Sequence, residues 1–204
     1  MLNLDVSKMH RYVFLGAKDI NWYQDCTDVF IKLFGEEKLP LVCKVFAATS
    51  INTSLKANIT LFRKAYYEIE NDLGVGNYLP NIQKQLRAIR RGEELTGRKI
   101  RAFAAAMAGD SNAVVVDIWL LRAFGCDNRY FRNSSQSIRS GGATEKQFTA
   151  IEGWVRQEAY CMKIEPRQLS AIIWAGVRID QTGDTVTHYK GILERELTNL
   201  FNVI

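Results

Sequence analysis

The chain has 204 residues, of which 47% are hydrophobic, and a net charge of +5, so it holds enough apolar material for one substantial core or two smaller helical ones. This composition excludes a disordered polypeptide, and no apolar run approaches the ~20 residues that a membrane-spanning helix needs. The first residues lack the basic and apolar regions of a secretory signal. We therefore expect an intracellular, cytoplasmic protein with no membrane partner.

The four cysteines are spread widely along the chain, at Cys26, Cys43, Cys126 and Cys161. No two of them form the C-x-x-C pair that zinc sites and iron–sulfur clusters use. We therefore expect reduced and mostly buried thiols, with no metal and no cofactor.

The first half of the chain is predicted to form helices from the three- and four-residue spacing of its apolar side chains. The stretch 2–16 is the exception, because its pattern fits a short strand as well as a helical turn. A helix is expected from Asp19 to Gly35, where the glycine ends it. Further helices, separated by turn and cap residues, are predicted at about 40–48, 55–69 and 80–91.

The second half of the chain continues the helical pattern. An alanine-rich helix is predicted between Gly97 and Gly109, followed by three valines and a short helix for which Asp117 is the N-cap. The fold class is therefore predicted to be all-α. The helices expected after Gly109 are at about 118–124, 144–162, 166–177 and 188–203.

Two stretches between these helices have the composition of loops. Residues 133–142 are rich in serine, glycine and asparagine, and we expect them to form a loop at a lobe boundary. Thr182-Gly183-Asp184 is expected to form a turn that joins two short extended pieces within 178–186.

Basic side chains are concentrated in the segment 84–101. It has seven basic residues against Glu93 and Glu94, a surplus of five positive charges that equals the net charge of the whole chain. Such a concentration is typical of a surface that binds a phosphate backbone, and a solvated helix face is the plainer alternative. The seven are Lys84, Arg87, Arg90, Arg91, Arg98, Lys99 and Arg101.

A lysine and an aspartate begin two successive predicted helices, Lys99 after a tight turn and Asp117 after three valines. The two can come face to face if the chain doubles back between them. An amine beside a carboxylate suits attack on the C1′ carbon of a sugar, because the amine can form a Schiff base while the carboxylate stabilises positive charge. Singly, each residue fits a plainer role as a surface lysine or a helix cap, and the pair together favours a site.

The motif Gly97-Arg98-Lys99, followed eighteen residues after the lysine by Asp117 in a Val-Asp pair, resembles the helix-hairpin-helix DNA glycosylases. That superfamily includes endonuclease III and 8-oxoguanine DNA glycosylase. The resemblance covers about 38–125 and implies an all-α, two-lobed helical bundle with a cleft between its lobes. One lobe is expected at 38–125, with the hairpin and the catalytic core, and a packing lobe at 1–37 plus 126–204, within a single compact unit.

The resemblance implies a DNA N-glycosylase that flips a damaged or modified base out of the duplex and excises it, with or without strand cleavage as an AP lyase. Lys99 corresponds to the lysine that attacks C1′, and Asp117 to the aspartate that supports the reaction as an electrostatic or base catalyst. Gly97 corresponds to a hairpin glycine whose N–H approaches a DNA phosphate. The expected partner is duplex DNA, bound by a monomer.

Further residues are candidates for contacts with the DNA. Asn52 and Thr53 lie in a polar loop between two predicted helices, where a side chain could enter the duplex after the base leaves, or simply cap a helix. Trp119 and Arg122 follow Asp117 and are candidates for a pocket wall or a phosphate contact. Phosphate contacts are also predicted for Arg98, Arg101, Arg90 and Arg91.

The chain departs from the family pattern at two places. The hairpin, which commonly reads L-P-G-V-G, is here Glu93-Glu94-Leu95-Thr96-Gly97, and Asp117 is followed by Ile118 and Trp119 instead of Thr-His. Three alternatives therefore stay open. They are a DNA-binding protein on the same fold without chemistry, an enzyme that acts on modified nucleotides, and a helical interaction protein.

Overall fold

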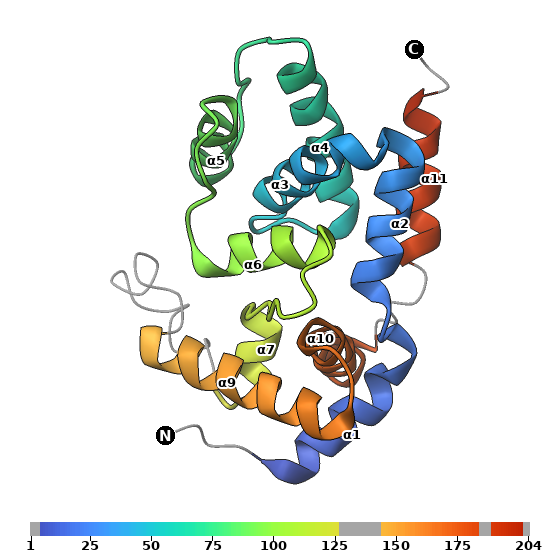
Figure 1. Cartoon of the computed structure of the whole chain (residues 1–204), viewed down its shortest axis with the longest axis vertical. Coiled ribbons are helices and arrows are strands. Elements are labelled where there is room, and N and C mark those ends of the chain that lie inside the picture. The colour runs from blue at the N-terminus through green and yellow to red at the C-terminus, as the bar shows by residue number, and fades with distance from the viewer. Residues whose placement is uncertain (1–4, 127–143, 184–188, 202–204) are drawn as a thin grey trace. The chain divides into compact units, whose positions relative to one another are not determined.

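The computed structural model describes residues 5–126, 144–183 and 189–201, and within these ranges its regular elements are all helices (Figure 1). The all-α prediction is confirmed for this part of the chain. None of the helices in these ranges combines the length and the apolar character needed to cross a membrane. The loop predicted at 133–142 lies outside the described residues.

The chain divides into two compact units. Unit 1 comprises Met1–Trp22 and Ser111–Thr187, and unit 2 comprises Tyr23–Asp110 and His188–Ile204. The expected lobes divided the chain at about 37 and 125, whereas these units divide it after Trp22, Asp110 and Thr187. Lys99 consequently belongs to unit 2 and Asp117 to unit 1.

Unit 1 is built around one long helix, α10 (Pro166–Thr182), which contacts each of the other helices that the structure describes in this unit. They are α1 (Val6–Gly16), the 3-10 turn η1 (Ala17–Asp19), α7 (Ile118–Ala123) and, across a helical hairpin, α9 (Glu145–Met162). The core between them contains Met9, Tyr12, Val114, Val116, Leu120, Phe124, Ile151, Val155, Leu169 and Ile173.

In unit 1, the structure settles one open prediction and corrects another. The undecided stretch 2–16 contains α1, which begins after Asp5, whose side chain accepts a hydrogen bond from the N–H of Lys8. Helix α10 continues to Thr182, so the extended piece expected after Arg178 is helical up to that point. Gly183, in the left-handed conformation, ends the helix where a turn was predicted.

Two glycines allow α1 and α10 to pack with their backbones in contact. A Cβ atom on Gly16 would lie 1.9 Å from the carbonyl oxygen of Ile172, and one on Gly176 would lie 1.9 Å from that of Tyr12. Neither position has room for a side chain, so this crossing fixes both residues as glycine.

Unit 2 is built around α3 (Leu39–Thr49), which packs against α4 (Leu55–Glu70), α5 (Pro80–Arg90) and α6 (Arg98–Met107). Helix α2 (Trp22–Phe34) belongs to this unit apart from its first residue, and η2 (Glu36–Lys38) and α11 (Tyr189–Phe201) complete it. Phe30, Phe46 and Phe62 meet in the core, with ring centroids 5.2 to 6.1 Å apart.

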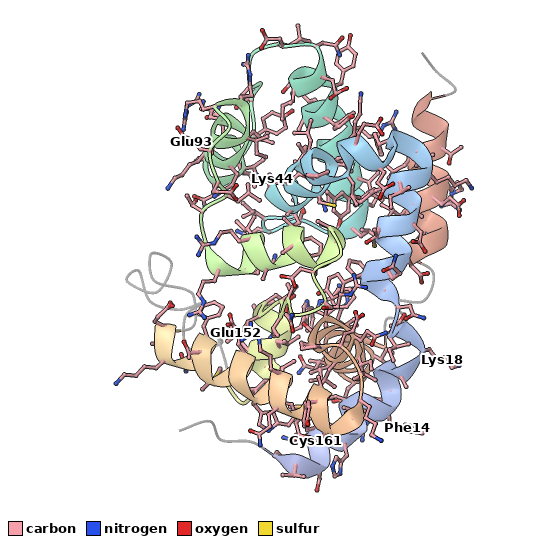
Figure 2. All side chains as sticks on the ribbon, viewed as in Figure 1. Phe14, Lys18, Lys44, Glu93, Glu152 and Cys161 are labelled. Atoms are coloured by element: carbon pink, nitrogen blue, oxygen red, sulfur yellow. The ribbon has the colours of Figure 1, made fainter. Side chains whose placement is uncertain are left out.

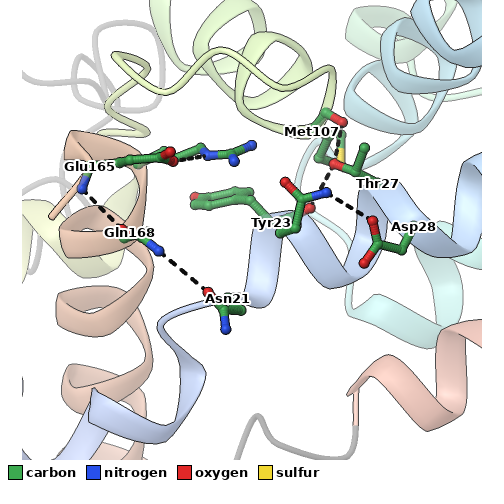
Figure 3. A network of polar contacts seen from close by, with 9 residues as sticks. Asn21, Tyr23, Thr27, Asp28, Met107, Glu165 and Gln168 are labelled. Carbon is green, nitrogen blue, oxygen red and sulfur yellow. Dashed lines mark hydrogen bonds and ion pairs between the residues drawn. The ribbon is translucent and has the colours of Figure 1, made fainter.

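Polar contacts, one buried and one exposed, connect segments inside each unit (Figure 3). In unit 2, the hydroxyl of Thr27 on α2 donates to the carbonyl oxygen of Met107 at the end of α6, at 2.6 Å. In unit 1, the amide of Gln168 on α10 donates to Oδ1 of Asn21 at 3.3 Å. These two hydrogen bonds hold the end of α6 and the start of α10, and Asp117 lies between these points in the sequence.

Candidate functional site

The hairpin between α5 and α6 is held by one buried side chain, Gln85. Its Nε2 donates to Oγ1 of Thr96 at 2.7 Å and to the Thr96 carbonyl oxygen at 3.3 Å, and its Oε1 accepts from the Thr96 N–H at 2.9 Å. Gly97 follows with a φ of 91°, a conformation that favours glycine, and caps α6. This clamp holds the turn between α5 and α6 in place.

Gln85 was not predicted as a site residue. The signal in the sequence is a glutamine at a core-facing position of α5, where its neighbours on the same face, Ile82, Leu86 and Ile89, are apolar and buried. A buried amide must find partners, and Thr96 supplies them.

Both acidic residues of the hairpin are paired with cations. Glu93 forms hydrogen bonds of 2.6 and 2.8 Å with the guanidinium of Arg91, and Glu94 lies 2.9 Å from the ammonium of Lys44 (Figure 2). The hydrogen bonds from Arg91 lower the pKa of Glu93. The two carboxylates therefore add little net negative charge to the hairpin surface.

Two of the arginines predicted to contact DNA have partners inside unit 2. Arg91 pairs with Glu93, and Arg90 lies 2.6 Å from Oδ1 of Asp72. Exposed ion pairs of this kind contribute little to stability, so a phosphate can replace either carboxylate at small cost. Arg101 is exposed on α6 and Arg98 is half-buried at its first position.

Lys99 is the second residue of α6 and is half-buried. Its ammonium lies 5.9 Å from the centroid of the Phe103 ring, one helical turn further along. The aromatic face keeps the long side chain along the surface of α6. In unit 2, the structure thus brings Lys99 together with Gly97, Arg98 and Arg101 at the start of one helix.

The loop that carries Asn52 and Thr53 joins α3 to α4. Asn52 is exposed, with a φ of 57°, and the hydroxyl of Thr53 donates to the carbonyl oxygen of Thr49 at 3.1 Å. Below the loop, the buried hydroxyl of Thr49 lies 2.6 Å from Oδ1 of Asn58. The loop therefore projects Asn52 from a base that is fixed by hydrogen bonds at both ends.

The pockets in the described parts of the units include one in unit 2 and one in unit 1. One, of about 170 Å³, lies along α6 and is lined by Pro40, Lys44, Glu94, Leu95, Arg101, Ala104, Ala105 and Ala108. The other, of about 440 Å³, is apolar and is lined by Val6, Met9, His10, Val13, Trp154, Glu158, Met162 and Leu169 of unit 1. Among the predicted site residues, Arg101 lines the first of these pockets and none lines the second.

Asp117 caps α7 with its side chain, as predicted. Its Oδ1 accepts from the N–H groups of Trp119, at 2.8 Å, and Leu120, at 3.0 Å, and the residue is half-buried. These two donors and the start of the helix favour the ionised carboxylate and fix its direction.

The three valines before Asp117 cross the interior of unit 1 and are buried. The N–H of Val115 donates to the fully buried hydroxyl of Ser170 on α10 at 3.1 Å, and the N–H of Arg167 donates to the carbonyl oxygen of Ser111 at 3.2 Å. The position of Asp117 thus depends on α10, and Ser170 is a second supporting residue that was not predicted.

The indole ring of Trp119 contacts two arginines. The guanidinium carbon of Arg122 lies 4.5 Å from the indole centroid, and that of Arg178 on α10 lies 5.4 Å from it. Arg178 also lies 5.3 Å from the ring of Trp174, which in turn packs 5.1 Å from that of Trp22. The structure therefore adds Arg178 and Trp174 to the predicted pair of Trp119 and Arg122.

No cluster of three or more histidine, cysteine or acidic side chains with the geometry of a metal site is found among the described residues.

Comparisons with known proteins identify one family. Residues 16–181 match the model of DUF7178, which is described as a family of unknown function. No curated protein and no solved structure matches the chain.

Proposed function

The chain belongs to the DUF7178 family, and we propose that it is a DNA N-glycosylase of the helix-hairpin-helix type, which excises a damaged or modified base from duplex DNA. The observation that carries the proposal is the order of three features along the chain. A clamped hairpin leads into α6 with Lys99 in its first turn, and Asp117, eighteen residues later, caps α7 with a carboxylate held by two N–H groups.

The proposed reaction begins when the target nucleotide is flipped out of the duplex. The bond from C1′ to the base nitrogen breaks, the base leaves with the bonding electron pair and takes up a proton, and positive charge develops on the sugar. The carboxylate of Asp117 stabilises that charge. Because the N–H groups of Trp119 and Leu120 already hold the carboxylate, little reorganisation is needed as the charge appears.

Lys99 is assigned the role of nucleophile. Once its ammonium has lost a proton, the amine forms a bond from Nζ to C1′ and, after opening of the sugar ring, a Schiff base. The same intermediate permits strand cleavage at the 3′ phosphate by elimination, which is the AP lyase reaction. A monofunctional course, in which water attacks C1′, leaves Asp117 with the same role.

The charge of the hairpin region is consistent with duplex binding. Glu93 and Glu94 are both paired with cations, and Lys84, Arg87 and Arg101 are exposed on α5 and α6. A basic surface next to the N-terminus of α6, where Gly97 precedes the N–H groups of the first helical turn, suits a backbone phosphate.

A DNA-binding protein without chemistry is the second candidate. It is consistent with the hairpin, where Glu93-Glu94-Leu95-Thr96-Gly97 lacks the proline and the first glycine that are common in helix-hairpin-helix glycosylases. This candidate predicts duplex affinity that falls steeply with salt and no product on any base lesion.

Borohydride trapping tests the proposal. The protein is incubated with duplexes that carry a broad panel of damaged and modified bases, and covalent adducts are detected by gel shift and located by mass spectrometry. A bifunctional enzyme gives an adduct at Lys99, which Lys99→Ala abolishes and the control Lys56→Ala, an exposed lysine on α4, retains. An adduct that survives Lys99→Ala removes Lys99 from the mechanism.

Base release without borohydride tests Asp117 separately. Asp117→Asn keeps a side chain that can cap α7, so duplex affinity and stability are expected to stay close to those of the wild type while excision falls by at least ~100-fold. Unchanged excision in this variant would reduce Asp117 to a structural cap. Duplex binding with neither adduct nor released base, across the whole panel, would favour the second candidate.

A further inference from the structure

Helices α7 and α10 of unit 1 carry a stack of aromatic rings and guanidinium groups. Arg122 lies over the indole of Trp119 at 4.5 Å, and Arg178 lies within 5.4 Å of both Trp119 and Trp174. All four residues are half-buried. We call these four residues, Arg122, Arg178, Trp119 and Trp174, the arginine–tryptophan stack.

Stacking on an indole determines what an arginine can still bind. The interaction holds the planar guanidinium against the ring face and leaves the N–H groups at its edge directed along the ring plane. Two rings restrain Arg178 in this way and one restrains Arg122. Less side-chain entropy is therefore lost when such a fork binds an oxyanion.

Arg122 differs in this respect from four arginines that are paired with carboxylates. Arg90, Arg91, Arg156 and Arg167 each lie within 3.3 Å of a carboxylate oxygen of their own unit. Within the ranges that the structure describes, Arg122 has a tryptophan ring and no carboxylate at ion-pair distance. Its positive charge is oriented without being neutralised.

The stack also changes the role of Trp119. Its ring packs against the core of unit 1 and carries guanidinium groups, so it supports the arginines and is not assigned to stacking on a base. Its backbone N–H donates to the carboxylate of Asp117 at 2.8 Å. One residue therefore links the proposed catalytic carboxylate to a cationic surface of the same unit.

We propose that the arginine–tryptophan stack is a phosphate-binding site of unit 1, in which Arg122 and Arg178 hold a backbone phosphate of the DNA strand close to the nucleotide that meets Asp117. The inference rests on the proposed function for the identity of the ligand. A guanidinium fork binds two phosphate oxygens at once, and such charge-assisted bonds are among the strongest hydrogen bonds that proteins make. The stack belongs to unit 1, whereas the basic residues of α5 and α6 belong to unit 2.

Salt-dependent binding of a lesion duplex, measured by fluorescence anisotropy, tests this site. Each phosphate contact contributes a factor of about 3.5 to the affinity lost in a fourfold increase in salt. Arg122→Gln and Arg178→Gln are each expected to weaken binding about tenfold at low salt and to lower the slope of log K against log salt by about one. The matched control is Arg156→Gln, which removes the same charge from α9 of unit 1.

Variants of Trp119 test the aromatic support of Arg122 and Arg178 separately from the charge of these two arginines. Trp119→Leu keeps both arginines and is expected to weaken binding severalfold while the salt slope falls only in part. Trp119→Phe retains an aromatic face and is expected to recover most of the affinity. Thermal unfolding of each variant shows whether it is folded, and Trp119→Phe keeps the comparison valid if Trp119→Leu unfolds.

The outcomes distinguish this site from the proposed function. If Arg122→Gln and Arg178→Gln bind the duplex with the affinity and salt slope of Arg156→Gln, the phosphate site is overturned. The proposed glycosylase function is still supported in that case if adducts form at Lys99 and excision requires Asp117. If the wild-type protein binds no duplex, both proposals are overturned together.

Discussion

The carboxylate of Asp117 is held by the backbone N–H of Trp119, at 2.8 Å, and not by any property of the tryptophan side chain. The side chain of Asp117 caps α7, and the ring of Trp119 supports the arginines. The two functions therefore belong to different side chains. Substitutions of Asp117 can be chosen that remove the charge but keep the cap.

The first prediction concerns the stability of three Asp117 variants in urea denaturation. Asp117→Asn and Asp117→Ser keep a side-chain oxygen for the two N–H groups, and their free energy of unfolding is expected to stay within ~0.5 kcal/mol of the wild type. Asp117→Ala leaves those groups without the carboxylate and is expected to lose about 1 kcal/mol. Equal losses in the asparagine and alanine variants would show that the charge, and not the hydrogen bond, stabilises the helix.

The second prediction concerns the contact of α1 with α10. Gly176→Ala would put a Cβ atom 1.9 Å from the carbonyl oxygen of Tyr12, so the helices must separate. We expect a loss of about 3 kcal/mol or more in the free energy of unfolding. Gly153→Ala, in the middle of α9 with nothing within 4 Å of the new atom, is the control and is expected to gain ~0.5–1 kcal/mol. A neutral Gly176→Ala would contradict this helix crossing.

The third prediction concerns the clamp on the hairpin. Gln85→Leu removes three hydrogen bonds to Thr96 and is expected to increase amide exchange across 93–97 and to weaken duplex binding. Gln83→Leu serves as the control, because Gln83 lies on the same helix but donates to the carbonyl oxygen of Gly76. If both variants exchange alike in the hairpin, Gln85 has no special part in holding it.

The fourth prediction concerns the buried hydroxyl of Ser170. Ser170→Ala leaves the N–H of Val115 without its partner in the interior, and the free energy of unfolding is expected to fall by about 1–3 kcal/mol. Thr60→Ala removes an exposed hydroxyl on α4 and is expected to change stability by less than ~0.5 kcal/mol. Indistinguishable melting of the two variants would show that Val115 has another acceptor.

The fifth prediction concerns thiol reactivity. Burial raises the pKa of Cys43 to about 12, and because alkylation requires the thiolate, Cys43 is expected to stay unmodified by iodoacetamide up to pH 9 in the folded protein. Cys161 is exposed on α9 and is expected to react (Figure 2). Mass spectrometry of the labelled peptides checks both, and denaturant should make Cys43 react as well. Early labelling of Cys43 without denaturant would place it at the surface.

Local patterns in the sequence predicted most of the helices, because helix spacing and caps are determined by neighbouring residues. The helices that begin after Ser54, Leu79 and Asp117 follow from their cap and proline signals. Helix α1 was left undecided because the pattern of 2–16 fitted a short strand as well as a helical turn, and its packing partner, α10, lies far away in the chain.

The candidate site shows the same division between local and distant causes. The cap by Asp117 is a local feature and was predicted. The contacts of Ser170 with Val115, 55 residues apart, and of Arg178 with Trp119 depend on how helices meet, so no local pattern indicates them. Gln85 lies between these two cases. The sequence shows a polar residue on the apolar face of a predicted helix, but it does not show that Thr96 is its partner.

The closest helix crossing in unit 1 also has a consequence for synthesis on the ribosome. Gly16 and Gly176 lie 160 positions apart, so α1 leaves the exit tunnel long before its partner exists. Met9 and Tyr12, which are buried in the finished protein, remain without their native cover while nearly all of unit 2 is translated. Most of unit 2 therefore precedes α10 in the order of synthesis, and unit 1 cannot complete its core until α10 emerges.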